Sequence, residues 1–246
     1  MARPPKTILA VDIGGTKLKV LLSGQNEPRK TPSGKTMTPG KMVDAVREKT
    51  ADWEYDAVSI GYPSQVGQNG PRSEALNLGP GWVGFDYAAA FGKPVRIIND
   101  ASMQALGSYE GGKMLFLGLG TGVGSALIAD NSIVPLELGR LRLRGEQTMG
   151  ELLGRRALKR ISKREWRQLV AEAVAMVSAA FVVDEVVLGG GNAKLMRELP
   201  HGVRLGHNLT AFRGGFRLWN IEDVVTHAAD GSPPAQPAPP TDWRLL

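Results

Sequence analysis

The stretch Ile8–Leu22, which reads I-L-A-V-D-I-G-G-T-K-L-K-V-L-L, contains the pattern that decides the fold. An apolar, β-prone run ends at Asp12, Gly14 and Gly15 form a tight turn, and residues 17–22 alternate as a second strand does. The stretch therefore predicts a β-hairpin. A turn without Cβ atoms lets backbone N–H groups approach phosphate oxygens, and a carboxylate at a strand end can hold hydrated Mg²⁺. A plain hairpin turn explains this motif equally well when it is taken alone.

The second half of the chain repeats this theme. Residues 114–117 predict a strand, 118–124 (G-L-G-T-G-V-G) a glycine loop and 125–129 a second strand. The loop leads into a strand rather than a helix, so it is not a Rossmann fingerprint, and no Gly-Lys-Ser/Thr follows, so it is not a P-loop. A glycine turn in each half predicts two related lobes that hold a phosphate chain between them.

The remaining pattern mixes helices with strands and predicts an α/β protein. We expect a small lobe over residues 1–100, a larger lobe over 101–227 whose last helix can pack back on the first, and a proline-rich disordered tail over 228–246. Helices are predicted over 41–49, 85–91, 101–109, 149–161 and 165–182, and further strands over 57–61, 95–98 and 186–188.

Two further motifs lie where predicted strands end. Asn99 and Asp100 follow the strand 95–98 and open a helix, so Asp100 is either a helix N-cap or a general base that deprotonates a hydroxyl attacking a phosphoryl group. Gly190 and Gly191 follow the last strand and open a helix, so they form either a tight turn or an anion contact. Glu151 falls in the first turn of a predicted helix, where the helix dipole alone favours a carboxylate.

Composition excludes several classes of site. The 246 residues contain no cysteine, so disulfides, thiolate zinc sites and cysteine nucleophiles are ruled out, and a cytoplasmic location fits this absence. We expect no signal peptide and no membrane span, because the longest nearly apolar run, residues 173–183, is too short. His201, His207 and His227 have no metal-ligand spacing, and we expect them on the surface or in the tail.

The chain carries a net charge of +6, which is compatible with a polyanionic partner. Ten Lys and Arg residues cluster between residues 140 and 167, and inorganic polyphosphate, nucleic acid or a membrane surface could each account for them. An ordinary basic surface is the alternative. The ten are Arg140, Arg142, Arg144, Arg155, Arg156, Lys159, Arg160, Lys163, Arg164 and Arg167.

The order of the motifs is more specific than any one of them. D-I-G-G-T-K, G-Y-P-S-Q-V, I-N-D-A, L-G-T-G-V-G-S-A-L, V-P-L-E-L-G-R and V-V-L-G-G-G follow one another in an order that resembles the ROK family of sugar kinases, relatives of hexokinase and actin. The resemblance covers residues 6 to about 225 and implies an actin-like ATPase (ribonuclease H-like) fold with two lobes around a central cleft. Residues 77–86 and 119–139 look most like polyphosphate glucokinases.

The resemblance also implies roles for single residues. Asp100 would be the catalytic base that takes the proton of the sugar 6-hydroxyl, and Asp12 would help to hold Mg²⁺, directly or through water. Asn99, Glu137 and Glu151 would bind other sugar hydroxyls. The contacts implied for the phosphoryl donor are Gly14, Gly15, Thr16, Lys17, Gly120, Thr121 and Gly122, with Gly190 and Gly191 near an adenosine if a nucleotide binds.

Two departures from the family pattern matter. The cysteine-rich zinc motif typical of ROK kinases is missing, which excludes zinc and fits the polyphosphate glucokinases. The histidine of the family's E-x-G-H motif is Arg140 here. An imidazole both donates and accepts hydrogen bonds, whereas a guanidinium only donates and is always charged. Arg140 could therefore contact an anionic substrate at the rim of the site or pair with Glu137.

The leading hypothesis is a Mg²⁺-dependent kinase that phosphorylates glucose or a related hexose from polyphosphate or ATP, with a homodimer implied by the resemblance. The alternatives are a non-catalytic sugar-binding protein on the same scaffold, a kinase for an anionic sugar, and a polyphosphate or nucleotide hydrolase. Retention of Asp12 and Asp100 speaks against loss of catalysis. A repressor is not expected, because no DNA-binding helix-turn-helix precedes the first strand, and nucleic acid is not the expected partner.

Overall fold

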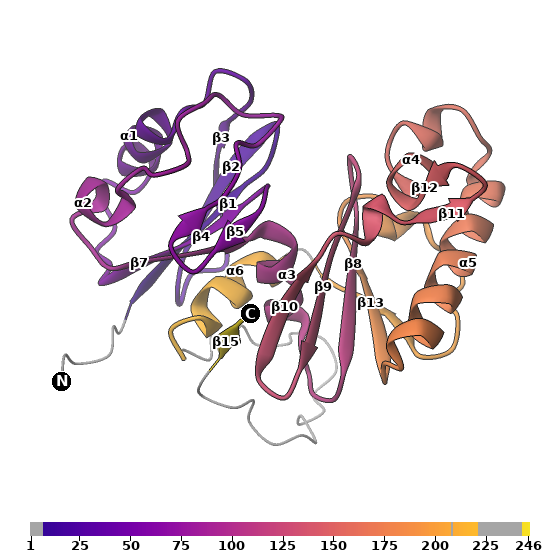
Figure 1. The fold of residues 1–246 in the computed structure, drawn as a ribbon. Helices are drawn as coiled ribbons and strands as arrows, with labels where there is room; N and C mark the ends of the chain where they lie inside the picture. Colours follow the sequence, from indigo (N-terminus) through magenta and orange to yellow (C-terminus); the bar gives the residue numbers. More distant parts are fainter. Residues whose placement is uncertain (1–6, 208, 221–242) are drawn as a thin grey trace. The chain divides into compact units, whose positions relative to one another are not determined.

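A computed structural model describes residues 7–207, 209–220 and 243–246 (Figure 1). They form two compact units. The first comprises the described parts of Met1–Gly107 and Ala211–Pro237, and the second those of Ser108–Thr210 and Ala238–Leu246. Residues 101–107 and 211–220 thus belong to the first unit; the prediction began the second lobe at residue 101 and let its last helix pack back on the first. Residues 228–242 of the predicted tail and His227 lie outside the described residues.

A five-stranded sheet in the order β3-β2-β1-β4-β7 forms the centre of the first unit. β1, β2 and β3 pair antiparallel, and β4 and β7 continue the sheet parallel to β1. The hairpin predicted at the start of the chain is confirmed, with Ile13 opposite Leu18. The strands are β1 (Ile8–Ile13), β2 (Lys17–Leu22), β3 (Arg29–Pro32), β4 (Ala57–Tyr62) and β7 (Val95–Asn99). A small hairpin, β5 (Val66–Gly67) and β6 (Gly70–Pro71), follows β4.

Helices cover both faces of this sheet. Leu9 and Val11 share a buried core with Met42 and Val46 of α1 (Pro39–Lys49), and this core extends to α2 (Tyr87–Phe91). α3 (Asp100–Ser108) and α6 (Thr210–Arg217) are also close to each other, because a Cβ at Gly214 would lie 1.8 Å from the carbonyl oxygen of Met103. The two successive glycines of α6 therefore let it approach α3 and the sheet closely.

A six-stranded sheet in the order β14-β13-β8-β9-β10-β15 forms the centre of the second unit. Its plan repeats that of the first, with an antiparallel run β8-β9-β10 and strands β13 and β14 parallel to β8. Trp166, Val170 and Val174 of α5 (Lys163–Phe181) pack into the core over this sheet. The strands are β8 (Met114–Leu119), β9 (Val123–Ala129), β10 (Ser132–Leu136), β13 (Glu185–Gly189), β14 (Val203–Leu205) and β15 (Arg244–Leu245).

The helix predicted over residues 149–161 is wrong in extent. α4 ends at Leu153 (Met149–Leu153), and residues 157–159 form a separate 3₁₀ turn, η2 (Ala157–Lys159). The cause is Gly154, whose backbone is extended and whose added Cβ would lie 2.6 Å from the carbonyl oxygen of Thr121. The chain leaves the helix there to pack against the glycine loop of residues 118–124.

The strand β10 was also missing from the prediction. It pairs with β9 through a turn at Asp130 and Asn131, which both have positive φ. Aspartate and asparagine tolerate the left-handed conformation that a tight hairpin requires. None of the helices in the described ranges combines the length and the apolar character needed to cross a membrane.

Candidate functional site

The first glycine turn links β1 to β2. The amide of Gly14 donates to the carbonyl oxygen of Lys17 at 3.0 Å, which closes the turn, and a Cβ on Gly14 would lie 3.0 Å from that same oxygen. Thr16 and Lys17 are exposed at its tip. The turn is tight enough to favour glycine on packing grounds, and it presents its following residues to solvent, as a phosphate-binding turn requires.

Residues of two other loops contact this turn. The amide of Ser33 donates to Thr16 O at 3.1 Å, and the Ser33 hydroxyl donates to Gly14 O. On another side, a Cβ on Gly15 would lie 3.0 Å from the Cβ of Asn77, whose exposed side chain lies against the turn. Sequence reasoning assigned no role to Ser33 or Asn77. Only the stretch N-L-G-P-G-W-V-G-F-D, which was used for the resemblance, pointed to Asn77.

Asp12 lies near the end of β1 and pairs with Lys19 of β2. Lys19 Nζ lies 2.9 Å from Asp12 Oδ2, and the Asp12 side chain is only 12% exposed. Mg²⁺ is usually held by one or two carboxylates together with substrate phosphates and waters. A single carboxylate with one oxygen engaged therefore fits the predicted role. Within the described ranges, no three His, Asp or Glu side chains gather as a metal cluster.

Asn99 and Asp100 lie at the junction of β7 and α3, and the structure distributes the capping role differently from the prediction. Asn99 Oδ1 accepts from the amides of Ala101 at 3.0 Å and Ser102 at 3.1 Å, so Asn99 caps the helix. Its Nδ2 donates to Ser64 O at 3.1 Å. Asp100 is the first helical residue, is half-buried, and accepts from the Ala101 amide at 2.8 Å. The helix therefore does not need Asp100 as its N-cap residue.

Asp12 and Asn99 share one edge of the first sheet. Both lie at the carboxyl ends of parallel strands, β1 and β7, with β4 between them. A Cβ on Gly61 of β4 would lie 2.6 Å from Met103 Cε and 3.5 Å from Asp100 Cα, so this glycine lets α3 begin close to the sheet. The first unit thus holds the predicted metal carboxylate, the first glycine turn and the predicted base at one edge.

The second glycine loop lies between β8 and β9 in the second unit. Thr121 and Gly122 are exposed, and a Cβ on Gly120 or Gly122 would meet no atom within 4 Å. Their φ values are not in the left-handed region. Neither packing nor backbone conformation therefore requires glycine at these two positions. The close approach of a ligand backbone or phosphate would require it.

Three chain segments meet beneath this loop. Gly120 O accepts from the amide of Arg155 at 3.0 Å and from Asn192 Nδ2 at 3.0 Å, and Leu119 O accepts from the Asn192 amide at 3.0 Å. Gly190 has φ +77°, and its added Cβ would lie 2.5 Å from Leu119 O. The structure therefore brings together the predicted donor contacts at Gly120 to Gly122 and at Gly190. It gives Gly190 a packing role that is independent of any nucleotide.

Glu137 and Arg140 lie around the 3₁₀ turn η1 (Leu138–Arg140). Arg140 Nε lies 3.5 Å from Glu137 Oε2, and the side chains are 76% and 52% exposed, respectively. Pairing with Glu137, one of the two roles predicted for Arg140, is therefore observed. An ion pair this exposed contributes about 0–1 kcal/mol to stability. Arg140 is held only weakly.

Glu151 forms a capping box at the start of α4. Its Oε2 accepts from the Thr148 amide at 2.9 Å and lies 3.1 Å from the Thr148 hydroxyl, while the Glu151 amide donates to that hydroxyl at 3.2 Å. The backbone hydrogen bond from Thr148 lowers the pKa of the Glu151 carboxyl. A Cβ on Gly150 would lie 2.9 Å from Gly139 O, so α4 and η1 are in close contact. Glu137, Arg140 and Glu151 therefore lie on neighbouring segments of the second unit.

Of the ten predicted basic residues, four have partners in the structure. Arg140 pairs with Glu137, Arg142 with Glu146 at 2.7 Å and Arg144 with Glu172, while Arg167 Nε donates to Leu195 O. The remaining six have no side-chain partner among the described residues. We call these six the basic segment: Arg155, Arg156, Lys159, Arg160, Lys163 and Arg164.

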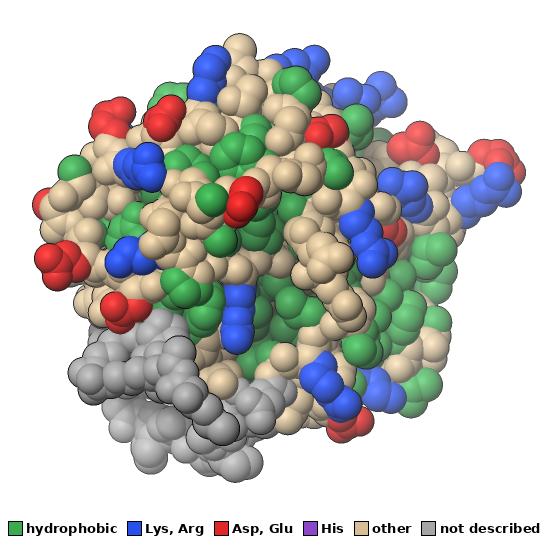
Figure 2. Space-filling model, turned by 60° about the vertical axis from the view of Figure 1, so that its left-hand side comes forward, with side chains coloured by type: hydrophobic (Ala, Val, Ile, Leu, Met, Phe, Trp, Pro, Cys, Tyr) green, Lys and Arg blue, Asp and Glu red, His purple; other side chains and the backbone are tan. Residues whose placement is uncertain are grey.

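On the face drawn in Figure 2, Lys and Arg side chains are dispersed among Asp and Glu, whereas the six exposed cations of the basic segment fall within residues 155–164. The basic segment begins at Arg155, whose amide is bonded to Gly120. Lys163 and Arg164 stand in the first turn of α5, where cations are unfavourable because of the helix dipole. An anionic ligand would relieve this unpaired charge.

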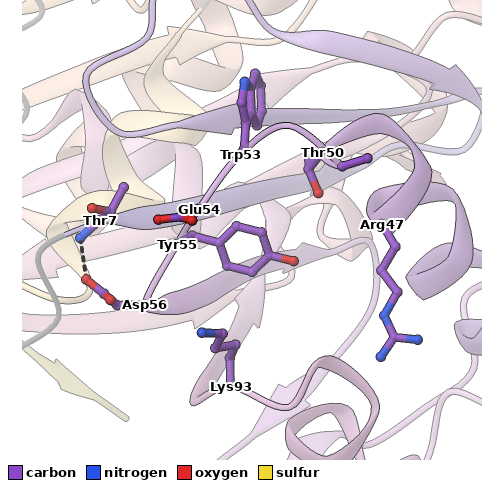
Figure 3. Close-up of a pocket in the computed structure, with 9 residues that line it drawn as sticks. Thr7, Arg47, Thr50, Trp53, Glu54, Tyr55, Asp56 and Lys93 are labelled. Atoms are coloured by element: carbon purple, nitrogen blue, oxygen red, sulfur yellow. Dashed lines mark hydrogen bonds between the residues drawn. The ribbon is translucent and has the colours of Figure 1, made fainter.

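A cavity of about 530 Å³ in the first unit is separate from these residues (Figure 3). Its lining includes Thr7 and Asp56, which precede β1 and β4 and are joined by a 3.0 Å hydrogen bond from Thr7 N to Asp56 Oδ2. The cavity therefore lies at the amino ends of these strands, opposite the edge that carries Asp12. No predicted site residue lines it.

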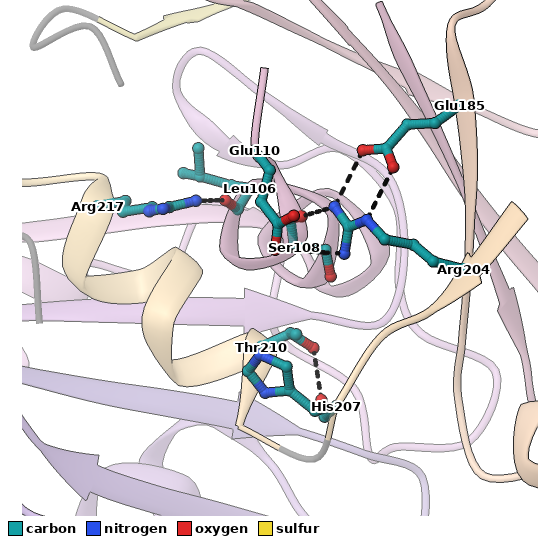
Figure 4. Close-up of polar contacts among 8 residues, drawn as sticks. All are labelled: Leu106, Ser108, Glu110, Glu185, Arg204, His207, Thr210 and Arg217. Carbon is teal, nitrogen blue, oxygen red and sulfur yellow. Dashed lines mark hydrogen bonds and ion pairs between the residues drawn. The ribbon is translucent and has the colours of Figure 1, made fainter. Parts of the chain in front are cut away.

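A second polar cluster has a structural role. Arg204 of β14 forms two hydrogen bonds with Glu185 of β13, at 2.7 and 2.9 Å, and lies 3.6 Å from Glu110 (Figure 4). These contacts join β14 to β13 and to the segment that follows α3. His201 and His207 are exposed, as predicted.

Comparisons with known proteins agree with this geometry. The sequence pattern of the ROK family matches residues 8–139. The bifunctional enzyme NanE/NanK of Brucella melitensis is 31% identical over 147 residues, which cover 54% of this chain and 28% of that protein. The polyphosphate glucokinase of Mycobacterium leprae is 28% identical over 216 residues, 77% of this chain and 65% of that protein. The chain thus spans less than a third of the first relative and about two thirds of the second.

Solved structures give the fold. The inorganic polyphosphate/ATP-glucomannokinase of Arthrobacter sp. strain KM is similar with a TM-score of 0.71 and 25% identity, covering 86% of this chain and 96% of that one. The α/β, actin-like ATPase fold predicted from the order of the motifs is confirmed.

Proposed function

Because the chain belongs to the ROK family, we propose that it is a sugar kinase that transfers a phosphoryl group to the 6-hydroxyl of glucose or a related hexose. The observation that carries the proposal is the glycine loop of residues 118–124. Gly120 and Gly122 have room for a Cβ and unstrained backbones, so the approach of a ligand is the remaining reason for glycine there. Such a loop beside unpaired cations suits a phosphate donor.

The proposed reaction follows from the residues at the edge of the first sheet. Asp100 accepts the proton of the sugar hydroxyl, whose oxygen forms a bond to the terminal phosphorus as the bond to the donor's bridging oxygen breaks. Asn99, Glu137 and Glu151 bind other hydroxyls of the sugar. Asn99 is fixed for this by its three hydrogen bonds to the backbone.

Donor contacts are assigned to both glycine turns. Gly14, Gly15, Thr16 and Lys17 would contact the phosphates from the first unit, and Gly120, Thr121 and Gly122 from the second. Asp12 would hold Mg²⁺, which neutralises charge on the donor phosphates when it is bound. If ATP is the donor, Gly190 and Gly191 would lie near its adenosine, and a Cβ on Gly191 would meet no atom within 4 Å.

We further propose that polyphosphate is the preferred donor. The basic segment has six cations without side-chain partners among the described residues, and it starts where Arg155 is bonded to the second glycine loop. A chain of phosphates that leaves this loop would pass along the segment, whereas the short triphosphate of ATP would reach less of it. The relatives named for polyphosphate support this choice.

The residues of the site constrain the identity of the sugar less than that of the donor. Arg140 replaces the family histidine, and its ion pair with Glu137 engages a carboxylate that would otherwise serve the sugar. This observation supports a second candidate, a kinase for another sugar, including an anionic one. A homodimer, which rests on the resemblance, and a cytoplasmic location, which fits the absence of cysteine, complete the proposal.

The preference for polyphosphate is tested by varying the salt concentration and by neutralising charges of the basic segment. Wild-type enzyme is assayed with glucose and Mg²⁺, with polyphosphate and ATP in parallel, at several salt concentrations. In the test variant Arg155, Arg156, Lys159 and Arg160 become Gln. In a matched control, four exposed cations outside the basic segment become Gln, namely Lys30, Lys41, Lys93 and Arg197.

We expect the KM for polyphosphate to rise steeply with salt and to rise at least about tenfold in the test variant, because long polyanions are held by many screened charges. The KM for ATP should change much less, and the control variant should resemble the wild type. If the enzyme prefers polyphosphate and its KM for polyphosphate changes neither with salt nor in the test variant, the role of the basic segment is refuted.

A further inference from the structure

The peptide unit between Gly120 and Thr121 has one end fixed and one end without a protein partner. Its carbonyl oxygen accepts two hydrogen bonds, from the Arg155 amide at 3.0 Å and from Asn192 Nδ2 at 3.0 Å. Its N–H, which belongs to Thr121, has no acceptor among the described residues. Since Thr121 is exposed, this donor faces solvent.

The geometry of a trans peptide connects these two ends. The C=O and the N–H of one planar trans unit point in opposite directions. Two donors that hold the Gly120 carbonyl toward Arg155 and Asn192 therefore hold the Thr121 N–H away from them. Because Gly120 has no Cβ and has open space beside it, this peptide unit could rotate if one of the two donors were lost.

Asn192 is the side chain that completes this arrangement. Its own amide donates to Leu119 O at 3.0 Å, and its Nδ2 donates to Gly120 O, so one residue fixes two successive carbonyls of the loop. Gly190, with φ +77° and only 2.5 Å from an added Cβ to Leu119 O, brings Asn192 close enough to do so. The Arg155 donor is a backbone group and is present whatever its side chain.

We propose that Asn192 is a positioning residue that fixes the Thr121 N–H in the orientation needed to bind a donor phosphate oxygen. The proposal rests on the proposed function. Asn192 touches the loop from the side opposite to the donor and acts through the Gly120–Thr121 peptide. It also couples the glycine turn after β13 to the one between β8 and β9.

The test compares Asn192→Ala with Asn192→His, whose Nδ1–H can replace the lost donor, and with Asn26→Ala, an exposed asparagine of the first unit, as a matched control. We expect Asn192→Ala to raise the KM for the phosphoryl donor about 3- to 10-fold, the effect of one lost hydrogen bond, with the KM for the sugar unchanged. Asn192→His should recover part of the affinity. Asn26→Ala should match the wild type.

A second readout does not depend on turnover. Hydrogen exchange at the Thr121 amide is measured with and without inorganic tripolyphosphate. Protection by tripolyphosphate in the wild type and its loss in Asn192→Ala are expected. If the wild type turns over no sugar but shows this protection, the proposed function fails and the positioning role stands.

Two results would overturn the positioning role. One is a donor KM that is unchanged in Asn192→Ala, or that changes in step with the sugar KM. The other is a Thr121 amide whose exchange in tripolyphosphate is the same in the wild type and in Asn192→Ala. Thermal melting of each variant separates these results from a general loss of folding.

Discussion

Lys19 Nζ lies 2.9 Å from Oδ2 of Asp12, across the first two strands of the chain. The two residues are direct partners in the antiparallel ladder, and the Lys19 side chain is 38% exposed. The pair occupies one oxygen of the carboxylate proposed to hold Mg²⁺. A cation fixed at this point also repels a second cation that binds nearby.

Replacing Lys19 by Met should therefore strengthen Mg²⁺ binding. We expect the Mg²⁺ concentration for half-maximal activity to fall about 3- to 10-fold, because one repulsive charge is removed from a partly screened site. The cost in stability should stay below about 1 kcal/mol, since Lys19 is partly exposed. Titration of activity with Mg²⁺ measures the effect, and Lys41→Met, an exposed lysine of α1, is the control. If the Mg²⁺ concentration for half-maximal activity falls no further in Lys19→Met than in Lys41→Met, Asp12 is not the metal residue.

The second unit contains two kinds of glycine, and replacement by alanine distinguishes them. Gly122→Ala should leave thermal stability unchanged or slightly raised, because its φ is ordinary and the added Cβ meets no atom, but it should weaken binding of the donor. Gly190→Ala should destabilise the protein by more than about 1 kcal/mol, because it combines a positive φ with a 2.5 Å contact. Thermal melts and donor KM values of both variants test this. Full donor affinity in Gly122→Ala would remove the loop from the donor site.

Arg140→His restores the family residue and should increase affinity for glucose. An imidazole can donate to one hydroxyl and accept from another, and we expect the KM for glucose to fall about 2- to 10-fold, as one added hydrogen bond would produce. Arg140→Met also breaks the pair with Glu137 but supplies no hydrogen bond, so it isolates the contribution of the ring. If both variants change the KM equally, loss of the ion pair rather than the imidazole is responsible.

Glu151 gives a dependence on pH. Hydrogen bonding from Thr148 lowers the pKa of its carboxyl in the folded protein, so its stabilising contribution is present above the unfolded pKa and is lost as pH falls through the folded pKa. The difference in melting temperature between the wild type and Glu151→Ala should be largest near neutral pH and should shrink below about pH 4. The difference in melting temperature between Glu151→Gln, which keeps an acceptor for the cap, and Glu151→Ala should not vary over this range, because neither variant has a titrating group at this position. A constant difference between the wild type and Glu151→Ala would contradict the capping role.

Local chemistry made much of the fold predictable. The hairpins at Gly14 and Gly15 and at residues 118–124 follow from strand patterns that flank glycines, and both occur as predicted. The end of α4 did not follow from its own sequence, because it depends on the approach of Gly154 to Thr121 O. Contacts between segments so far apart in the sequence leave no periodic pattern in either one.

The candidate site was also predictable only in part, because it depends on contacts between distant segments. The motif Asn99-Asp100 was readable, but which of the two caps α3 depends on how the amide of Asn99 faces the helix. Lys19, Asn77 and Asn192 were missed because each is a single polar residue beside a glycine motif. Their importance comes only from a partner elsewhere in the fold, at Asp12, Gly15 and Gly120.

The central claim is phosphoryl transfer to a sugar with Asp100 as base, and phosphorus-31 NMR of the products tests it most directly. Wild-type enzyme and Asp100→Asn are incubated with glucose, Mg²⁺ and polyphosphate or ATP, and each reaction is repeated without glucose. We predict glucose 6-phosphate from the wild type and a rate lower by about 10²- to 10⁴-fold in Asp100→Asn, with the melting temperature preserved. Equal product from both proteins, or free phosphate released at the same rate without glucose, would contradict the account.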